Sequence, residues 1–156
     1  MEDIEERLSR TSSDLGIDQF KENQFELMKA DVGDLNISCV LPTGWGKSSC
    51  YLVPGITDFE DTNRTIIIIQ PTVSLQCDQI KILRDHNIKF LLFNATNKKK
   101  RLYFNRDCTE FNYNYMCPFI FMTPESFVHY YKPLIVFLNN ANKIRRIVID
   151  EVHCVL

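Results

Sequence analysis

The sequence contains little glycine, no long apolar run and no marked excess of either charge. Only 5 of its 156 residues are glycine, and 18 basic residues face 20 acidic ones, for a formal net charge of −2. Without a basic surplus, any contact with nucleic acid must be local. No apolar run approaches the roughly 20 residues that span a bilayer. We therefore expect no membrane partner.

Two further patterns are missing from the sequence. Residues 1–10 are highly charged and lack the apolar segment of a signal peptide. The six cysteines form no C-x-x-C pair. We expect reduced thiols without disulfides or a zinc site, in an intracellular protein that is nuclear if its source is eukaryotic. The cysteines are Cys39, Cys50, Cys77, Cys108, Cys117 and Cys154.

Alternating apolar runs and helical periods predict an α/β fold with a mostly parallel sheet flanked by helices. The strands are expected at residues 37–41, 65–70, 89–93, 119–122 and 144–149. The helices are expected at residues 1–10, 47–56, 72–86 and 133–140. A turn at residues 11–14 and an acidic loop at residues 58–63 lie between them, residues 103–116 stay unassigned, and the basic run 98–101 is interpreted as a solvated face.

Residues 41–50, Leu-Pro-Thr-Gly-Trp-Gly-Lys-Ser-Ser-Cys, have the character of a phosphate-binding loop between a strand and a helix. Gly44 and Gly46 supply backbone freedom, so that successive N–H groups turn toward one spot. Lys47 adds a positive charge for the β- and γ-phosphates of a nucleotide, and the Ser48 hydroxyl is placed to ligate Mg²⁺. The strict G-x-x-x-x-G-K-[ST] pattern fails at Leu41.

A second chemical anchor lies near the end of the chain, where residues 147–149 precede Asp150 and Glu151. A carboxylate at the tip of a buried strand suits Mg²⁺, and a second one can orient and deprotonate an attacking water. A strand ending in two acids is common. Paired with the loop at residues 41–50, it predicts binding of a nucleoside triphosphate.

Several segments together resemble the RecQ type of superfamily-two DNA helicases, in the family's order. They cover residues 15–156. Residues 150–154, Asp-Glu-Val-His-Cys, resemble the D-E-x-H box with its trailing cysteine. Residues 15–24 resemble the L-G-x-x-x-F-R-x-x-Q segment, and residues 41–51 resemble M-P-T-G-G-G-K-S-L-C-Y, which also explains Leu41. The remaining matches are residues 71–79, similar to P-L-x-S-L-x-x-D-Q, and residues 123–125, similar to T-P-E.

The resemblance implies a RecA-like fold that binds Mg-ATP and DNA, with DNA unwinding in the 3′–5′ direction. Lys47 and Glu151 would be catalytic, Ser48 and Asp150 would hold Mg²⁺, and Gln24 would read adenine. The residues implied at the nucleotide are Phe20, Lys21, Gln24, Thr43, Gly44, Trp45, Gly46, Lys47, Ser48, Ser49, Asp150 and His153. Those implied at single-stranded DNA are Pro71, Thr72, Ser74, Gln79, Thr123 and Pro124.

The sequence departs from this family at three points. Lys21 replaces the usual arginine, Trp45 replaces a glycine of the loop, and Val152 replaces an alanine. The family continues past the D-E-x-H box with an aromatic-rich loop, an S-A-T strand and a second RecA-like domain carrying arginine fingers, whereas this sequence ends at Leu156. The resemblance therefore implies an N-terminal segment at residues 1–14 and part of a first motor domain at residues 15–156.

A chain that lacks these family parts is expected to be marginally stable alone, to hydrolyse ATP slowly and to depend on a second RecA-like domain. Two other interpretations remain open. The chain could be a non-catalytic ATP- or nucleic-acid-binding module, or a degenerate helicase fragment, that acts through a partner. It could also be another P-loop ATPase with a similar acidic box, which the matches at Gln24 and at residues 71–79 disfavour.

Overall fold

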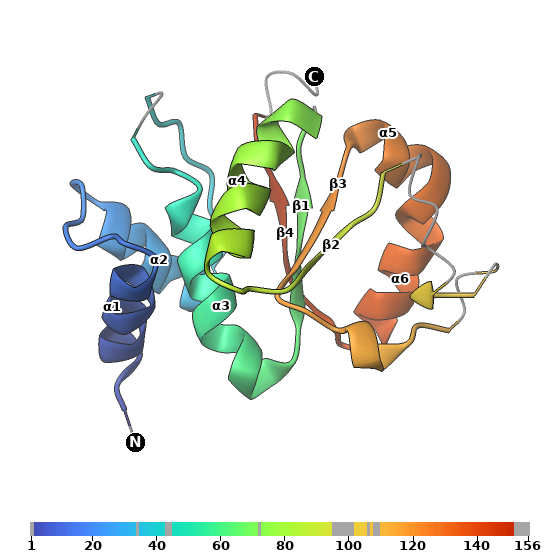
Figure 1. The fold of residues 1–156 in the computed structure, drawn as a ribbon, viewed down its shortest axis with the longest axis horizontal. Coiled ribbons are helices and arrows are strands. Elements are labelled where there is room, and N and C mark those ends of the chain that lie inside the picture. The colour runs from blue at the N-terminus through green and yellow to red at the C-terminus, as the bar shows by residue number, and fades with distance from the viewer. Residues whose placement is uncertain are drawn as a thin grey trace. The chain divides into compact units, whose positions relative to one another are not determined.

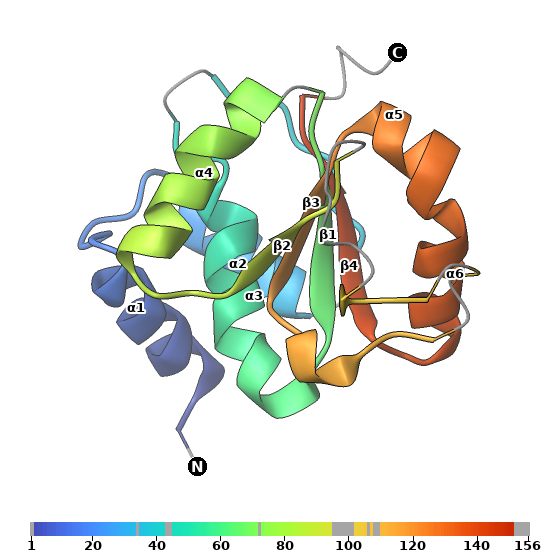
Figure 2. The same cartoon turned by 45° about the vertical axis from the view of Figure 1, so that its right-hand side comes forward.

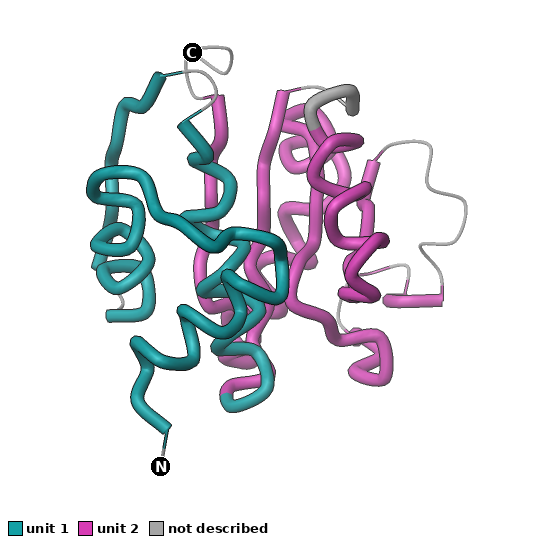
Figure 3. Tube along the Cα trace, turned by 60° about the vertical axis from the view of Figure 1, so that its left-hand side comes forward, with its two compact units in different colours: residues 1–61 teal, residues 62–156 magenta. Residues whose placement is uncertain are grey.

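The computed structural model describes residues 2–33, 35–42, 45–71, 73–94, 102–105, 107 and 110–151, with the side chains of residues 73–75 excepted. The chain forms two compact units, residues 1–61 and residues 62–156, which Figure 3 draws in teal and magenta. Among the described residues, every helix falls short of the length and apolar character that a membrane span requires.

The first unit is helical. Its helices are α1 (Ile4–Asp14), α2 (Gln24–Val32) and α3 (Ser49–Thr62). Leu8, Met28 and Val53, one from each helix, form a fully buried apolar cluster. Arg7 of α1 adds a salt bridge of 2.5 Å to Asp61 of α3. Because Leu8 is completely buried, α1 is part of the core of this unit.

The second unit is built on a four-stranded parallel sheet in the order β2-β3-β1-β4. Its strands are β1 (Thr65–Ile69), β2 (Phe90–Leu92), β3 (Phe119–Met122) and β4 (Ile144–Ile149). All residues of β1 and β3 are buried. Isoleucine-rich and aromatic strands of this kind suit the centre of a parallel sheet, where both faces are covered.

Helices lie on both sides of this sheet, as Figures 1 and 2 show. The helices are α4 (Val73–Asp85), α5 (Pro124–Ser126) and α6 (Lys132–Asn140), with a π-helical turn at Phe127–Tyr131 joining the last two. The chain steps from β1 past β3 to β2 through α4, and from β3 past β1 to β4 through α5 and α6. Right-handed crossovers that run in opposite directions place their helices on opposite faces of a sheet.

The segment between β2 and β3 packs through aromatic rings. Phe104 pairs with Phe111 in an isolated antiparallel bridge, and a 3₁₀ turn follows at Tyr113–Tyr115. The Phe93 ring stacks on Tyr131 with centroids 5.1 Å apart and meets Phe104 edge-on at 5.5 Å. The unassigned residues 103–116 thus include a small aromatic cluster.

Asparagine takes over a backbone role that glycine usually fills. Asn63, Asn87 and Asn142 have φ angles of 51° to 57° and follow the ends of α3, α4 and α6. A residue in this left-handed region ends a helix, and asparagine tolerates the conformation because its short polar side chain can bond locally. The scarcity of glycine is thus compensated at three helix ends.

Most of the expected elements of the second unit are confirmed. The strands predicted at residues 65–70, 89–93 and 119–122 correspond to β1, β2 and β3, and the helix predicted at residues 72–86 corresponds to α4. The helix predicted at residues 133–140 is α6, which begins one residue earlier. The mostly parallel α/β arrangement is therefore confirmed. The basic run at residues 98–101 lies outside the described residues.

The strand expected at residues 37–41 is wrong. Residues 35–42 form neither helix nor strand, and Val40 is 99% exposed. An apolar run becomes a strand only where a neighbouring strand satisfies its N–H and C=O groups. None of the described strands pairs with residues 37–41.

Three helix boundaries also differ from expectation. The turn predicted at residues 11–14 belongs to α1, and residues 58–62 of the predicted acidic loop belong to α3. That helix runs through Pro54, although proline removes one backbone donor from it. The sequence of residues 16–28 has a helical period that places Phe20 on one face with Gln24, Leu27 and Met28, but α2 begins at Gln24 and Phe20 lies outside it.

The strand that leads to Asp150 is less buried than the sequence predicts. The side chains of Ile147 and Ile149 in β4 are 47% and 52% exposed. β4 lies at the edge of the sheet and pairs only with β1 among the described strands. Ile147 and Ile149 are two residues apart, so their side chains project from the same face of this edge strand, and that face is exposed.

Candidate functional site

Gln24 connects two predicted nucleotide-binding segments of the first unit. It is the first residue of α2, and only 4% of it is exposed. Its Oε1 accepts a hydrogen bond from the Lys21 backbone N–H at 3.0 Å, and its Nε2 donates to the Gly46 carbonyl at 3.2 Å. The residue before it, Asn23, has a φ of 64°, which turns the chain into the helix. The amide of Gln24 thus ties the 20–24 segment to the loop at residues 41–50.

Two separate observations favour glycine at position 46. Its φ is +83°, in the left-handed region that disfavours side chains. A Cβ atom there would also lie 2.9 Å from Gln24 Nε2, closer than van der Waals contact allows. The bond between Gln24 and the loop therefore depends on a residue without a side chain at position 46.

Lys47 and Ser48 lie at the entrance of α3. The carbonyls of Gly46 and Lys47 accept bonds from the N–H groups of Ser49 and Cys50 at 3.2 and 3.1 Å, so the first turn is tight. A helix begun this way presents the positive end of its dipole, next to the charge of Lys47. The expected helix after the loop is thus confirmed, although it begins at Ser49.

Two aromatic residues flank this part of the first unit. Phe20 packs on Phe25 with ring centroids 4.8 Å apart, and Phe20 remains 36% exposed. Trp45 is half-buried, and its backbone N–H donates to the Pro42 carbonyl at 3.2 Å. The exposed part of Phe20 offers an apolar ring surface beside Lys21.

The acidic pair lies at the carboxyl end of β4, in the second unit. Asp150 N–H continues the ladder by donating to the Ile69 carbonyl at 3.0 Å. Its Oδ1 accepts from the Glu151 backbone N–H at 2.9 Å, and its Oδ2 accepts from Gln70 Nε2 at 3.1 Å. These donors hold the carboxylate in one orientation. An oriented, oxygen-rich group of this kind suits a hard cation such as Mg²⁺.

Glu151 has an unusual backbone conformation. Its φ is 55°, and among the described residues it is the only one with a positive φ that is neither asparagine nor glycine. Such a conformation is disfavoured for a long side chain and concentrates at functional sites. The strained position coincides with the residue that the sequence predicts to handle the attacking water.

The predicted DNA-binding residues of the second unit follow the neighbouring strands. Thr123 follows β3, and its Oγ1 accepts from the Ser126 backbone N–H at 3.2 Å, which caps α5. Pro71 comes two residues after the end of β1, and Gln79 is buried in α4. Since the strands are parallel, Pro71, Thr123 and Asp150 share one end of the sheet.

Several predicted residues cannot be placed. Thr43, Gly44, Thr72 and His153 lie outside the described residues, as does the side chain of Ser74. The sequence also missed Gln70, which bonds Asp150 from the end of β1. The sequence feature that could have indicated Gln70 is its position as a polar residue between a run of four isoleucines and a proline.

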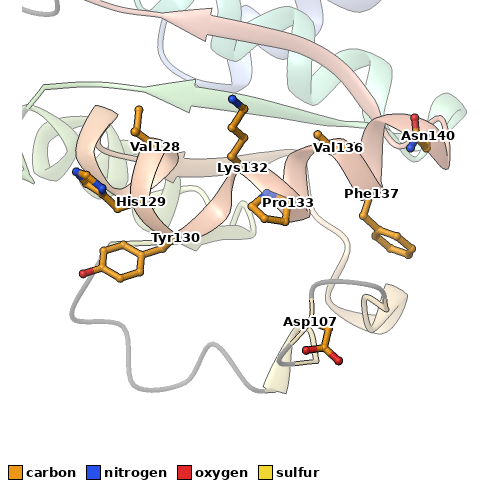
Figure 4. A pocket seen from close by; sticks show the side chains of 9 residues that line it. All are labelled: Asp107, Val128, His129, Tyr130, Lys132, Pro133, Val136, Phe137 and Asn140. Atoms are coloured by element: carbon orange, nitrogen blue, oxygen red, sulfur yellow. The ribbon is translucent and has the colours of Figure 1, made fainter.

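A shallow, open pocket of the second unit lies away from these residues. It has a volume of about 710 Å³ and is lined mainly by residues of α6 and the preceding π-helical turn, among them Val128, Lys132 and Val136 (Figure 4). It contains none of the predicted site residues.

The described cysteines show no sign of a metal or disulfide role. Cys39, Cys50, Cys77 and Cys117 are free thiols, and no metal-ligating cluster occurs in the part of the chain that the structure describes. Burial raises the pKa of Cys50 to about 12, with smaller contributions from Cys39 and Asp31. Burial likewise raises the pKa of Cys117 to about 12. Both thiols are therefore protonated and poorly nucleophilic.

The sequence profile of DEAD/DEAH box helicases matches residues 21–156. The chain belongs to this family. The matched range includes Gln24, the loop at residues 41–50 and the acidic pair. The resemblance to helicases is confirmed.

RecQ helicases are among the relatives. The ATP-dependent helicase SGS1 of Saccharomyces cerevisiae is 34% identical over 140 residues, covering 87% of this chain and 9% of that protein. The ATP-dependent DNA helicase RecQ of Bacillus subtilis is 34% identical over 89 residues, covering 56% of this chain and 14% of that protein. A protein of Acanthamoeba polyphaga mimivirus, provisionally named an ATP-dependent RNA helicase, is 34% identical over 140 residues, covering 90% and 24%.

The solved structure of the helicase MrfA has the same fold. It matches with a TM-score of 0.68 and 21% identity, over 98% of this chain and 24% of that chain. This likeness supports a RecA-like fold. The chain thus spans a quarter or less of the length of these proteins.

Proposed function

We propose that this chain is the ATP-binding part of a RecQ-type, ATP-dependent DNA helicase that moves in the 3′–5′ direction. Family membership and the relatives' names support this. The observation that carries the proposal is the buried Gln24 amide, bonded both to Lys21 and to the Gly46 carbonyl. An amide that bonds residues 20–24 to the loop at residues 41–50 supports the proposal that both segments border one nucleotide.

Gln24 retains the chemistry that adenine recognition needs. A glutamine amide has two N–H donors and an oxygen with two lone pairs. Its two bonds in this structure use one donor and one lone pair. Counting bonds among the described residues only, this leaves one donor and one acceptor, which match the N6 donor and N7 acceptor of adenine, whereas guanine presents two acceptors at that edge. We propose that Phe20 and Lys21 border the base, beside Gln24.

Lys47, Ser48, Asp150 and Glu151 are proposed to handle the phosphates. Lys47 would contact the β- and γ-phosphates, with the backbone of Thr43, Gly44, Trp45, Gly46 and Ser49 around them. Ser48 and Asp150 would hold Mg²⁺, which neutralises charge on the phosphates when bound. Glu151 would orient a water molecule and accept its proton. His153 would link this site to the rest of the motor.

The nucleic-acid contacts are proposed for the ends of β1 and β3 and for α4. Pro71, Thr72, Ser74, Gln79, Thr123 and Pro124 would approach the DNA backbone through hydroxyls, an amide and main-chain N–H groups. Contacts of this kind position a strand without reading its sequence. The helicase MrfA has been solved with DNA and AMPPNP, so one protein of this fold binds both kinds of ligand.

The proposal is tested by titrating the chain with a fluorescent ATP analogue and Mg²⁺. Lys47→Ala removes a charged bond to phosphate and should weaken binding about 10- to 100-fold, because such bonds contribute roughly 1.5–3 kcal/mol. The control is Lys81→Ala, which removes an exposed lysine of α4 and should leave binding unchanged. Equal affinity in all three proteins would overturn the proposed nucleotide site.

ATP hydrolysis separates the remaining alternatives. Turnover that single-stranded DNA stimulates more than RNA of the same sequence supports a DNA helicase part. Greater stimulation by RNA would replace DNA with RNA as the substrate, in line with the name of the mimivirus relative. Nucleotide binding without any turnover, with or without nucleic acid, would favour a non-catalytic module.

A further inference from the structure

We infer that Gln70 positions the metal-binding carboxylate of Asp150 and accepts a hydrogen bond from a water molecule of the bound Mg²⁺. This inference rests on the proposed Mg-ATP site. Nothing in the motifs of the chain points to Gln70, which stands between the isoleucines of β1 and Pro71. The structure assigns its role through three observations.

The first observation is that the backbone holds both residues in place. Gln70 N–H donates to the Met122 carbonyl at 3.1 Å, and Asp150 N–H donates to the Ile69 carbonyl at 3.0 Å. The ends of β3, β1 and β4 are therefore hydrogen-bonded side by side. Gln70 and Asp150 lie on adjacent parallel strands at the same level, so their side chains meet without any loop rearrangement.

The second observation is the direct bond between the two side chains. Gln70 Nε2 donates to Asp150 Oδ2 at 3.1 Å, while Asp150 Oδ1 accepts from Glu151 N–H. The amide can have only this orientation, because an ionised carboxylate accepts hydrogen bonds and would repel the Gln70 oxygen. Each carboxylate oxygen has its own donor, and so the plane of the carboxylate is set.

The third observation concerns the other half of the amide. Gln70 is only 1% exposed, yet its Oε1 has no hydrogen-bond partner within the described part of the chain. A buried acceptor without a donor is unfavourable and calls for a specific explanation. Apolar side chains would fill this position at the end of an isoleucine strand without that cost. The amide is therefore suited to a ligand that brings its own donor.

A hydrated magnesium ion supplies such a donor. Mg²⁺ gives up its water reluctantly and is usually held by one or two carboxylates plus several retained waters. Groups that bond to the ligands of a metal, and not to the metal itself, orient those ligands and affect affinity strongly. Gln70 would do this in two ways, through Nε2 to Asp150 and through Oε1 to a metal-bound water. Its role is therefore that of a positioning residue.

The test compares two buried amides. Gln70→Leu removes the donor and the acceptor while keeping a similar volume. The matched control is Gln76→Leu, since Gln76 is fully buried and also has an amide atom without a partner among the described residues, but lies in α4 with its bond to Asn94. We would titrate Mg²⁺ into each protein bound to a fluorescent ADP analogue, and measure the affinity for the analogue in EDTA separately. Gln70→Met serves as a second variant if Gln70→Leu fails to fold.

We expect Gln70→Leu and Gln70→Met to weaken Mg²⁺ binding about 10- to 100-fold, with nucleotide affinity in EDTA unchanged. Gln76→Leu should change neither quantity. The inference is overturned if the Gln70 variants bind Mg²⁺ as wild type does while Asp150→Asn loses it, or if Gln76→Leu lowers Mg²⁺ affinity to the same extent. If the wild-type chain binds no nucleotide even in EDTA, the proposed function fails first and this inference fails with it.

Discussion

The replacement Gly46→Ala tests the contact between Gln24 and Gly46 in the first unit. Gly46 has a φ of +83°, and an added Cβ would lie 2.9 Å from Gln24 Nε2. Gln24 is buried, and its Nε2 donates to the Gly46 carbonyl. The variant therefore introduces backbone strain and also displaces a hydrogen-bonded amide.

The expected cost follows from adding these effects. A side chain in the left-handed region costs roughly 1–2 kcal/mol. Leaving the buried Gln24 amide without its partner costs roughly 1–3 kcal/mol. Alanine also restricts the unfolded chain, which offsets about 0.4–1 kcal/mol. We expect the free energy of unfolding to fall by roughly 1–5 kcal/mol, as urea denaturation would measure it.

Two other glycines of the same unit separate the contributions. Gly16 has a φ of +81° but nothing within 4 Å of an added Cβ, so Gly16→Ala reports the backbone strain alone. Gly33 lies at the end of α2 with a φ of −75°, and an added Cβ would meet only carbonyl oxygens at 3.5 Å, so Gly33→Ala should be neutral or slightly stabilising.

The decisive measurement is Gly46→Ala in a Gln24→Ala background. With the amide already removed, the cost of Gly46→Ala should drop to that of Gly16→Ala. If the cost is the same with and without Gln24, the close contact between these two residues has no energetic weight and the reasoning is refuted.

Two further predictions concern the core and the thiols. Leu8→Ala should lower the free energy of unfolding by about 2–5 kcal/mol, because Leu8 is fully buried against Met28 and Val53. The control Glu6→Ala, on the exposed face of α1, should change it by less than about 0.5 kcal/mol. Equal effects of the two replacements would mean that α1 is only a solvated segment. In native protein near neutral pH, a maleimide should label the exposed Cys39 and Cys77 well before Cys50 and Cys117, because the pKa values of the latter two are raised to about 12. Mass spectrometry of the digested protein would measure the labelling rates. Labelling of Cys117 as fast as Cys39 would contradict the prediction. Because the folded state holds these two protons more tightly than the unfolded state, we expect stability to fall as the pH rises above the ordinary thiol pKa of 9.0 toward 12.

Local sequence patterns predicted the two buried central strands and the helix α4. The isoleucine run of β1 and the apolar residues of β3 are buried in adjacent strands, as the β-branched and aromatic composition indicates. The period of α4 was visible because one face of that helix is apolar. The family segments, from Gln24 to Asp150, also stood out in the sequence alone, because their chemistry depends on residue type and spacing.

Residues 37–41 show the limit of prediction from local sequence patterns. Their apolar composition is that of a buried strand, yet a strand exists only if a neighbour satisfies its backbone, and residues 35–42 have no such neighbour among the described strands. The exposure of Ile147 and Ile149 could not be predicted from their apolar composition either, since burial of a strand's face depends on what packs against it in the tertiary structure.

The sequence by itself determined the family of this protein, its parallel α/β class and the residue types at its proposed nucleotide site, since these are written in composition, period and spacing. Only the tertiary structure brought Gln24 onto the Gly46 carbonyl and Gln70 onto the Asp150 carboxylate, 22 and 80 residues apart in the chain. A hydrogen bond between distant side chains depends on strand order and register. No local pattern encodes that proximity.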